Sequence, residues 1–594
     1  MVGAWLGSSM IILPFIGALL LLIVGKWKAD TTGFVMWIGM LVLAISYFRT
    51  NIGVAFIASI AGFIKSYPIA LMVCTSIFMI TYMQKTGALQ RITVAFKTLG
   101  GEGKEPFQIM FINIGLGCFL VSIGATPVTM LPPIMLAIGY SARSSVALPS
   151  IGYDPLTTFA LLAIPAVIFQ QTISGLFGLD PIFPTLAYSG FIFSLFMPVV
   201  TTGIALGMLF IAGGRKMLFR KDSLLFALVG GLVAGGSAIL VNGLAYRFQL
   251  DGLVPLTGLV AGLLTCLAML LLAVIMKYKI VDNNNLTEED IKIKESMPLW
   301  KALMPWIILV VLCGITNFIP QVFEFLFTTL SMKIYISGAS PISLQVFWNA
   351  WFWVIVATVL SMPFLGVKKI LKDTLKTWSR RAIRPVFAAA IFFSVAFVMT
   401  YSGATGEIVD GSWVIDNAHN MISTLAITTE NIFGKYYPLI VPFVGLLGGF
   451  VSGSETSSIA MFTRFHFFTG EGIGTSPVGL VILGAANGIG GGLASVLSPA
   501  KIQNATAVID KQGMEGEIIK KTAPIALLMV ASVSIITLCW SQGYAAWQWV
   551  VAFIIGIAII TIIFLGFYGL SLLRKRRALK KEKIDIMKDE EDFL

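Results

Sequence analysis

Residues 444–456 read Val444-Gly-Leu-Leu-Gly-Gly-Phe-Val-Ser-Gly-Ser-Glu-Thr456. This stretch begins as an apolar helix and then meets a Ser-Gly-Ser sequence with an acid beside it. Because glycine permits a turn that other residues rarely adopt, we expect the helix to break here. The backbone N–H groups freed by a break are unsatisfied in lipid, so they must face protein, water or a ligand. The stretch therefore predicts a helix that is interrupted inside a membrane.

The composition of the whole chain also indicates a membrane protein. Of its 594 residues, 57% are hydrophobic and only 12% are charged, about half of the ~25% that is usual in soluble domains. So few charges cannot keep a surface of this size in water, which excludes most classes of soluble enzyme. The chain also has no Walker-type nucleotide motif, no HExxH and no convincing GxSxG, which disfavours ATP-driven pumping and hydrolysis. We expect no enzyme activity and no cofactor.

Runs without charged residues locate the membrane-spanning helices. A span needs about 20 apolar residues, and the last run, 522–573, is long enough for two spans. We expect an all-α polytopic membrane protein with about 12–14 transmembrane helices, some of them broken or re-entrant. The first run leads straight into Lys26 without a basic start, which favours a retained first helix over a cleaved signal peptide.

Positive charge predicts the orientation of these helices. The basic segments are Lys26/Lys28, Arg215–Lys221, Lys277–Lys301, Lys368–Arg384 and Arg574–Lys583. Such segments stay in the cytoplasm, so the C-terminal tail is expected there. The segment 404–434 holds four acids and no Lys or Arg, and we place it outside. The net charge of +12 then reports topology in a plasma membrane, and we expect no nucleic-acid partner.

Two sequence stretches recur in the second half of the chain. The first, Thr81–Gly87, matches Thr400–Gly406 at four of seven positions. The second, Ile114–Thr126, aligns without gaps on Val444–Thr456. Charge places the end of the first helix inside and that of its counterpart outside, so the two halves have opposite orientation. Inverted repeats are typical of secondary transporters, whereas chance similarity between apolar helices is the alternative reading.

The repeats and the charge pattern suggest five regions. We expect a first repeat with the N-terminal helices at 1–250 and connecting helices with a cytoplasmic loop at 251–330. The inverted second repeat is expected at 331–521, followed by C-terminal transmembrane helices at 522–573 and a charged tail at 574–594.

The two helix breaks are the candidate substrate site. A half-helix N-terminus carries partial positive charge and free N–H donors, which suits a carboxylate. Small residues at such places can also simply allow close helix packing. We favour the binding site because the pattern occurs at matching places in both halves. The candidates at the breaks are Ser122, Gly124, Thr126, Gly453, Ser454, Thr456 and Ser457.

Four further residues complete the predicted site. Glu455 and Asp154 are the acids nearest the breaks, and an acid inside a membrane is most often a proton or cation site. An N-cap is the alternative role for Asp154. Asn487, amid glycines, is a candidate substrate ligand. Lys501 either pairs with a carboxylate or is one more cytoplasmic charge.

The histidines complete the list of titratable candidates. His419 and His466 are too few and too far apart for a metal site, and we expect both to be solvated or interfacial.

The chain resembles the lactate permease family over most of its length. The most specific stretches are Pro442–Ser458 and Ala485–Gly492 through Ser498-Pro499, with weaker support from Phe63–Pro68 through Thr86-Gly87 and from Thr400–Gly403. The resemblance implies a prokaryotic plasma-membrane permease that is built from inverted repeats and takes up L-lactate, often also D-lactate and glycolate, with protons. The acidic Gly-Ser-Asp/Glu-Thr-Ser-Ser motif of that family falls on Gly453–Ser458, so Glu455 takes the place of its acid.

Three departures from the family pattern bear on the substrate. The segment Ser122–Val128 stands where the family commonly has Gly-Phe-Gly-x-Pro-Val, and Tyr153-Asp154 where small or amide residues are usual. Lys501 follows the Ser498-Pro499 pair, whereas the family often has a lysine before it. The transporter class is unaffected, but another small carboxylate or a sulfonate becomes an alternative to lactate.

We therefore expect a secondary active transporter that imports lactate or a similar small 2-hydroxy monocarboxylate with protons. Its partners are the substrate, H⁺ (or Na⁺) and the lipid bilayer. The alternatives are a Na⁺-coupled carboxylate or sulfonate carrier, or a cation/proton antiporter, on the same architecture. A channel is disfavoured by the inverted halves, and a membrane enzyme by the lack of converging Asp, His or Arg residues.

Overall fold

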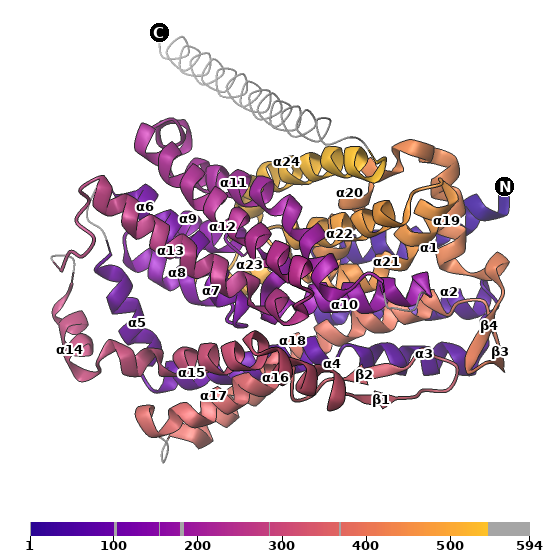
Figure 1. Cartoon of the computed structure of the whole chain (residues 1–594), viewed down its shortest axis with the longest axis horizontal. Helices are drawn as coiled ribbons and strands as arrows, with labels where there is room; N and C mark the ends of the chain where they lie inside the picture. The colour runs from indigo at the N-terminus through magenta and orange to yellow at the C-terminus, as the bar shows by residue number, and fades with distance from the viewer. Residues whose placement is uncertain are drawn as a thin grey trace, which may run out of the picture.

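The computed structural model describes residues 2–99, 104–153, 155–178, 183–283, 286–366 and 370–543. Most of these residues are helical, and many of the helices run along the long axis of the molecule (Figure 1). The helices of the first half are α1 (Val2–Ile23), α2 (Ala29–Ser46), α3 (Ile52–Lys65), α4 (Tyr67–Lys85), α5 (Ala88–Lys97), α6 (Glu105–Ile109), α7 (Gly117–Ser122), α8 (Pro127–Ala137), α9 (Ala142–Ile151), α10 (Ala160–Phe177), α11 (Leu186–Leu218), α12 (Lys221–Phe248) and α13 (Thr257–Ile275).

The second half continues in the same way. Its helices are α14 (Glu288–Ser296), α15 (Leu299–Phe318), α16 (Pro320–Glu324), α17 (Ala350–Leu365), α18 (Ile370–Thr400), α19 (Met421–Phe433), α20 (Val441–Ser452), α21 (Glu455–Gly472), α22 (Pro477–Leu493), α23 (Pro499–Ala507) and α24 (Glu515–Ser541). Short π-helical or 3₁₀ segments join several of them, at Met110–Leu116, Thr157–Phe159, Asp251–Leu256, Phe325–Thr329, Asn417–His419 and Gly434–Leu439.

The prediction of a polytopic helical membrane protein is confirmed. Within the described residues, 11 helices are long and apolar enough to cross a membrane. The number is 12 if the pair Met421–Leu439 and Val441–Ser452, bent by 93°, counts as one broken span. Of the two spans expected in 522–573, the first lies in α24 and the second falls outside the described residues.

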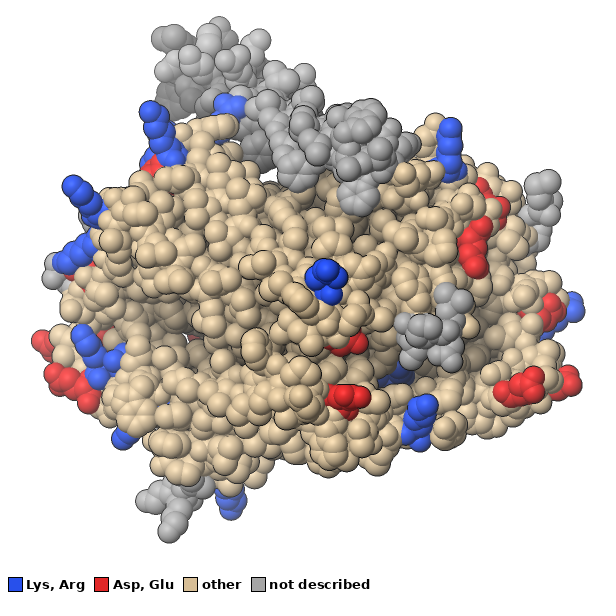
Figure 2. Space-filling model, viewed as in Figure 1, with Lys and Arg blue, Asp and Glu red and all other residues tan. Residues whose placement is uncertain are grey.

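The surface has the apolar character that lipid requires. Large apolar side chains are exposed along the outer helices, for example Leu13 on α1 at 62% and Leu267 on α13 at 52%. Figure 2 shows most Lys, Arg, Asp and Glu side chains of one face near the two ends of the molecule, with a belt between them that carries only a few charges. A hydrocarbon layer around that belt leaves few charges out of water.

Two short antiparallel hairpins accompany the helices and are not predicted by the sequence analysis. In one, β1 (Met332–Ile334) pairs with β2 (Ile342–Leu344). In the other, β3 (Ala404–Val409) pairs with β4 (Ser412–Ile415) across an irregular register. The second hairpin lies in the acidic segment that is expected outside the membrane.

Helices α3 and α4 together run antiparallel to α18. Asn51 N donates to Ala404 O (2.9 Å) at one end of the pair, and an Arg381 guanidinium N–H donates to Gln84 Oε1 (2.9 Å) at the other. Between them, Ser394 Oγ donates to Ser59 O (2.8 Å). The stretches ending at Gly87 and Gly406 therefore point in opposite directions, as an inverted repeat requires. The repeat itself stays a prediction.

Helices α20 and α22 meet backbone to backbone through glycine. A side chain at Gly445 would collide with the carbonyl of Asn487, and one at Gly490 with the carbonyl of Pro442. Gly449 lies in the same way against the carbonyl of Gly491. The Gly-rich run 488–492 thus allows close helix packing. This packing holds α22 against α20 and also against α21, where the Cβ position of Gly491 meets Ser458, beside the second break.

Candidate substrate and proton site

The second break lies where the sequence predicts it. Helix α20 ends at Ser452 and α21 begins at Glu455. Gly453 between them has φ of +72°, a left-handed conformation that glycine adopts at little cost. Ser454 is the N-cap of α21, and its side chain accepts a hydrogen bond from Ser457 N (3.4 Å). The sequence therefore sets both the end of one helix and the start of the next.

The first break has a similar form. Helix α7 ends at Ser122, and α8 begins at Pro127 with Thr126 as an N-cap whose side chain makes no capping hydrogen bond. Gly124 has φ of +83°, and a side chain there would also collide with Met72 on α4. Proline suits the first helical position, because a backbone N–H at that position would have no hydrogen-bond partner within the helix.

Glu455 is the buried acid of the site. Its side chain is only 5% exposed, and Thr158 Oγ1 donates to Glu455 Oε1 at 2.6 Å. The second oxygen, Oε2, has no hydrogen-bond partner among the described residues. A side chain at Gly492 would stand 2.8 Å from this oxygen and 2.6 Å from Thr157 Oγ1, so both groups lie against α22. The carboxyl group therefore keeps one oxygen for a proton or a ligand.

The 3₁₀ turn Thr157–Phe159 connects the two breaks. Thr158 reaches Glu455 at the second break, as described. On the other side of the turn, the carbonyl of Phe159 and the side chain of Ser122 both lie within 3.2 Å of the Cβ position of Gly258. Residues 161–163, which begin one residue after the end of the turn, have φ between 55° and 59°. Such a left-handed run costs roughly 1–2 kcal/mol per residue, and strain of this kind gathers at functional sites.

Several hydroxyl groups at the breaks have free hydrogen-bonding capacity. Ser122 Oγ and Ser457 Oγ are buried without a partner among the described residues. Thr456 is buried beside them in α21, and Thr126 is half-buried. Unpaired buried polar groups cost free energy unless a ligand, an ion or water satisfies them. The two breaks can therefore supply hydrogen-bond donors and acceptors to a polar ligand.

Asn487 is held by other side chains of the protein. It is fully buried, its Oδ1 lies 3.0 Å from His466 Nε2, and its Nδ2 donates to Ser458 O at 3.4 Å. The other ring nitrogen of His466 contacts the hydroxyl of Tyr437. The chain Tyr437–His466–Asn487 is thus a closed polar network inside the membrane-spanning body.

The expectation for the histidines is half wrong. His419 does lie at the surface, where its Nδ1 is 2.7 Å from Asp416 Oδ2. His466, however, is fully buried rather than solvated or interfacial. Its two partners supply the hydrogen bonds that an interior imidazole needs, and Tyr437 lies 29 residues away in sequence.

Lys501 lies near the second break, because Ser498, just before α23, stands 3.2 Å from the Cβ position of Gly453. It is in the first turn of α23, donates from Nζ to Ser495 Oγ at 2.6 Å, and stands 3.8 Å from the ring centroid of Tyr153. Its charge also acts on Glu455. Asp154, the other predicted acid, lies outside the described residues.

Sequence reasoning missed three residues that the structure adds to the site. Thr157 and Thr158 bring the first half of the chain to Glu455, and His466 holds Asn487. A Thr-Thr pair directly after the Pro155 segment was the available signal for the first two. No local signal marks His466, because its partners come from other helices.

A bundle of membrane-spanning helices with two helix breaks around an interior carboxyl group is the architecture of a membrane transport protein. Comparison with known proteins agrees. The sequence model of L-lactate permease matches residues 8–542, and the chain belongs to that family. It is thus a permease and not an enzyme.

Individual relatives have related names. The glycolate permease of Escherichia coli K12 is 24% identical over 588 residues, which covers 90% of this chain and 96% of that protein. The L-lactate permease of the same strain is 28% identical over 187 residues, about 31% of this chain and 30% of that protein. The L-lactate permease of Streptococcus iniae is 20% identical over 78% of this chain and 91% of its own length.

Among solved structures, the YdaH transporter of Alcanivorax borkumensis covers 82% of this chain and 87% of its own chain, at 12% identity and a TM-score of 0.38.

Proposed function

We propose that this permease imports lactate, glycolate or a similar small 2-hydroxy monocarboxylate together with protons across a prokaryotic plasma membrane. The basic residues of its C-terminal tail support a cytoplasmic location for that end of the chain. The observation that carries the proposal is Glu455, a buried acid with one unpartnered oxygen at a helix break. The relatives named for lactate and glycolate support the substrate class.

Protonation of Glu455 gives a physical reason for coupling. A carboxylate that crosses a low-dielectric path carries a charge that is expensive to bury. A proton taken up by Glu455 cancels that charge, so the loaded carrier crosses more easily than the carrier with the anion alone. Because Glu455 touches α22 and the turn Thr157–Phe159, a change in its charge alters contacts between the two halves of the chain. Alternating access then follows from movement of the broken helices against the other spans.

A Na⁺-coupled carrier of carboxylates or sulfonates is the second candidate. The unpartnered hydroxyls of Ser122 and Ser457 are oxygen ligands of the kind that Na⁺ accepts, and Glu455 Oε2 adds a charged one. Broken helices supply free carbonyls for such ions as well. A cation/proton antiporter would use the same groups without the organic anion.

Uptake of labelled lactate into proteoliposomes tests the substrate and the coupling ion together. With an imposed pH gradient, inside alkaline, we expect accumulation that is the same in choline and in sodium buffers. Unlabelled glycolate and other 2-hydroxy monocarboxylates should compete, whereas propionate and methanesulfonate should compete weakly. Strict dependence on Na⁺, or competition by sulfonates alone, contradicts the proposal and favours the second candidate.

A further inference from the structure

A cavity of about 270 Å³ lies apart from the transport site, where several helices end together. Its wall comes from residues 249–253, which follow α12 and lead into α13, and from residues 317–328, which include the end of α15 and part of α16. Asp251 in this wall also reaches α11, because its Oδ1 accepts a hydrogen bond from Ala187 N at 2.7 Å. The cavity therefore lies at one shared end of α11, α12, α13 and α15.

The charge pattern predicts that this end of the four helices lies at the outer surface of the membrane. Helices α11 and α13 run into the basic segments 215–221 and 277–301, and α12 and α15 begin in them. Such segments stay in the cytoplasm, so the opposite ends lie outside. Phe318 of the cavity wall is 69% exposed, and Phe248, which directly precedes the wall in sequence, is 64% exposed. We therefore expect the mouth of the cavity at the level of lipid head groups, beside side chains that face lipid.

Two carboxyl groups and two stacked rings give the cavity its chemical character. Asp251 and Glu324 both line it, and among the described residues no ion pair joins either of them to a basic side chain. Figure 2 shows Asp or Glu atoms near the middle of the face, over the place that α16 has in Figure 1. Phe323 and Phe327 stack in the same wall, with ring centroids 5.0 Å apart. Carboxylates and aromatic faces both attract cations, so the cavity suits a positively charged ligand.

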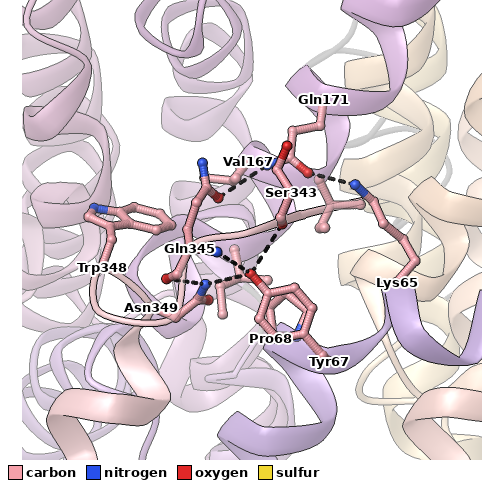
Figure 3. A pocket seen from close by; sticks show the side chains of 11 residues that line it. Lys65, Tyr67, Pro68, Val167, Gln171, Ser343, Gln345, Trp348 and Asn349 are labelled. Carbon is pink, nitrogen blue, oxygen red and sulfur yellow. Dashed lines mark hydrogen bonds between the residues drawn. The ribbon is translucent and has the colours of Figure 1, made fainter. Parts of the chain in front are cut away.

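The aromatic part of the wall is fixed from behind. The ring of Trp348 lies edge-on against both phenyl rings, and its Nε1 donates to Asn317 Oδ1 at 3.1 Å. Figure 3 shows the segment that carries Trp348. There the hydroxyl of Tyr67, at the start of α4, accepts hydrogen bonds from Gln345 N (2.8 Å) and from Asn349 Nδ2 (3.1 Å). A wall held in this way loses little conformational freedom when a ligand enters, which favours binding.

The size of the cavity favours a small organic cation over a bare metal ion. Sites for small molecules begin at roughly 300 Å³, whereas one water takes about 30 Å³. A metal ion held by two carboxylates would leave most of the 270 Å³ to water. A primary ammonium group has three N–H donors for the two carboxylates, and the carbon atoms next to it can contact the rings.

We propose that this cavity binds the primary ammonium head group of a phospholipid in the outer leaflet, with the acyl chains along Phe248 and Phe318. A lipid of this kind brings the ammonium group to the level of the mouth and its chains to the exposed apolar side chains. The site is independent of the proposed function, because no residue of its wall belongs to the two helix breaks.

The test is thermal unfolding of the purified full-length protein in micelles of a neutral detergent. Phosphatidylethanolamine, phosphatidylcholine and phosphatidylglycerol with the same acyl chains are added one at a time, and free ethanolamine and MgCl₂ are added without lipid. For the wild type we expect phosphatidylethanolamine to raise Tm more than any other addition, because a ligand that binds the folded state stabilises it. In the double variant Asp251→Asn/Glu324→Gln, the amount of phosphatidylethanolamine that gives half of the shift should rise about tenfold or more, since both charged contacts are lost. Asparagine at position 251 can still accept the hydrogen bond from Ala187, so α11 keeps its start.

Glu407→Gln is the matched control, because it removes an exposed acid from β3, outside this cavity. It should respond to each addition like the wild type. If phosphatidylethanolamine and phosphatidylglycerol stabilise the wild type equally, or if the double variant keeps the wild-type response, the head-group site is refuted. An equal effect of phosphatidylcholine refutes the choice of a primary amine. An equal effect of free ethanolamine that the double variant loses supports the ammonium site and refutes a lipid as its source. A larger effect of MgCl₂ that the double variant loses refutes the ammonium site in favour of a metal site.

Discussion

Glu455→Gln is expected to abolish accumulation driven by a pH gradient while exchange of labelled for unlabelled lactate continues. Glutamine has nearly the same shape and can still accept the hydrogen bond from Thr158, so the break keeps its form. It carries no titratable proton and resembles the protonated, loaded carrier. The variant can therefore carry substrate across the membrane in both directions, but it cannot bind and release a proton. Gradient-driven uptake should fall about tenfold or more, in the range of typical coupling free energies.

The measurement uses proteoliposomes with equal amounts of each protein, assayed once with a pH gradient and once for exchange at equal pH. Glu517→Gln is the matched control, because Glu517 is an exposed acid in a surface ion pair. It should transport like the wild type in both assays. Glu455→Asp keeps a carboxyl group and should restore part of the gradient-driven uptake. Full accumulation by Glu455→Gln would remove Glu455 from the proton path.

Gly490→Val is expected to prevent folding of the membrane-spanning body. The added side chain would overlap with the carbonyl oxygen of Pro442. That oxygen belongs to the backbone of α20, so it cannot move away as a flexible side chain could. Overpacking of a core usually costs about 1–3 kcal/mol even where side chains can shift. Here two helix backbones must separate, so the cost exceeds that range. The helices that would separate are α20, which ends at the second break, and α22, which carries Asn487.

The yield of monodisperse protein after membrane extraction and gel filtration measures this effect. Gly314→Val is the matched control, since the Cβ position of that glycine, within α15, has no neighbour within 4 Å. The control should give a wild-type elution profile and yield, whereas Gly490→Val should aggregate or be degraded. A stable, monodisperse Gly490→Val protein would show that α20 and α22 do not pack as described.

The helices and their breaks could be predicted because both depend on local sequence. Charge-free runs long enough to span a bilayer are direct consequences of hydropathy, and Gly124 and Gly453 act on their own backbone. The short hairpins escaped prediction since their strands have three to six residues each and lack a clear alternating pattern.

The partners within the site could not be predicted, because they come from distant parts of the chain. Thr158 is 297 residues from Glu455, and no periodicity reports such a contact. Asn487 amid glycines was predicted to be a substrate ligand. In the structure the glycines allow α22 to approach α20, and the amide of Asn487 is held by His466.

The proton flux that accompanies lactate most directly tests whether this permease is a proton symporter. Sealed proteoliposomes with an internal pH indicator receive lactate from outside, with protein-free and Glu455→Gln vesicles as controls for diffusion of the free acid. Proton symport predicts internal acidification and external alkalinisation above both controls, in proportion to labelled lactate uptake. Uptake above the controls without any additional change in pH would contradict it.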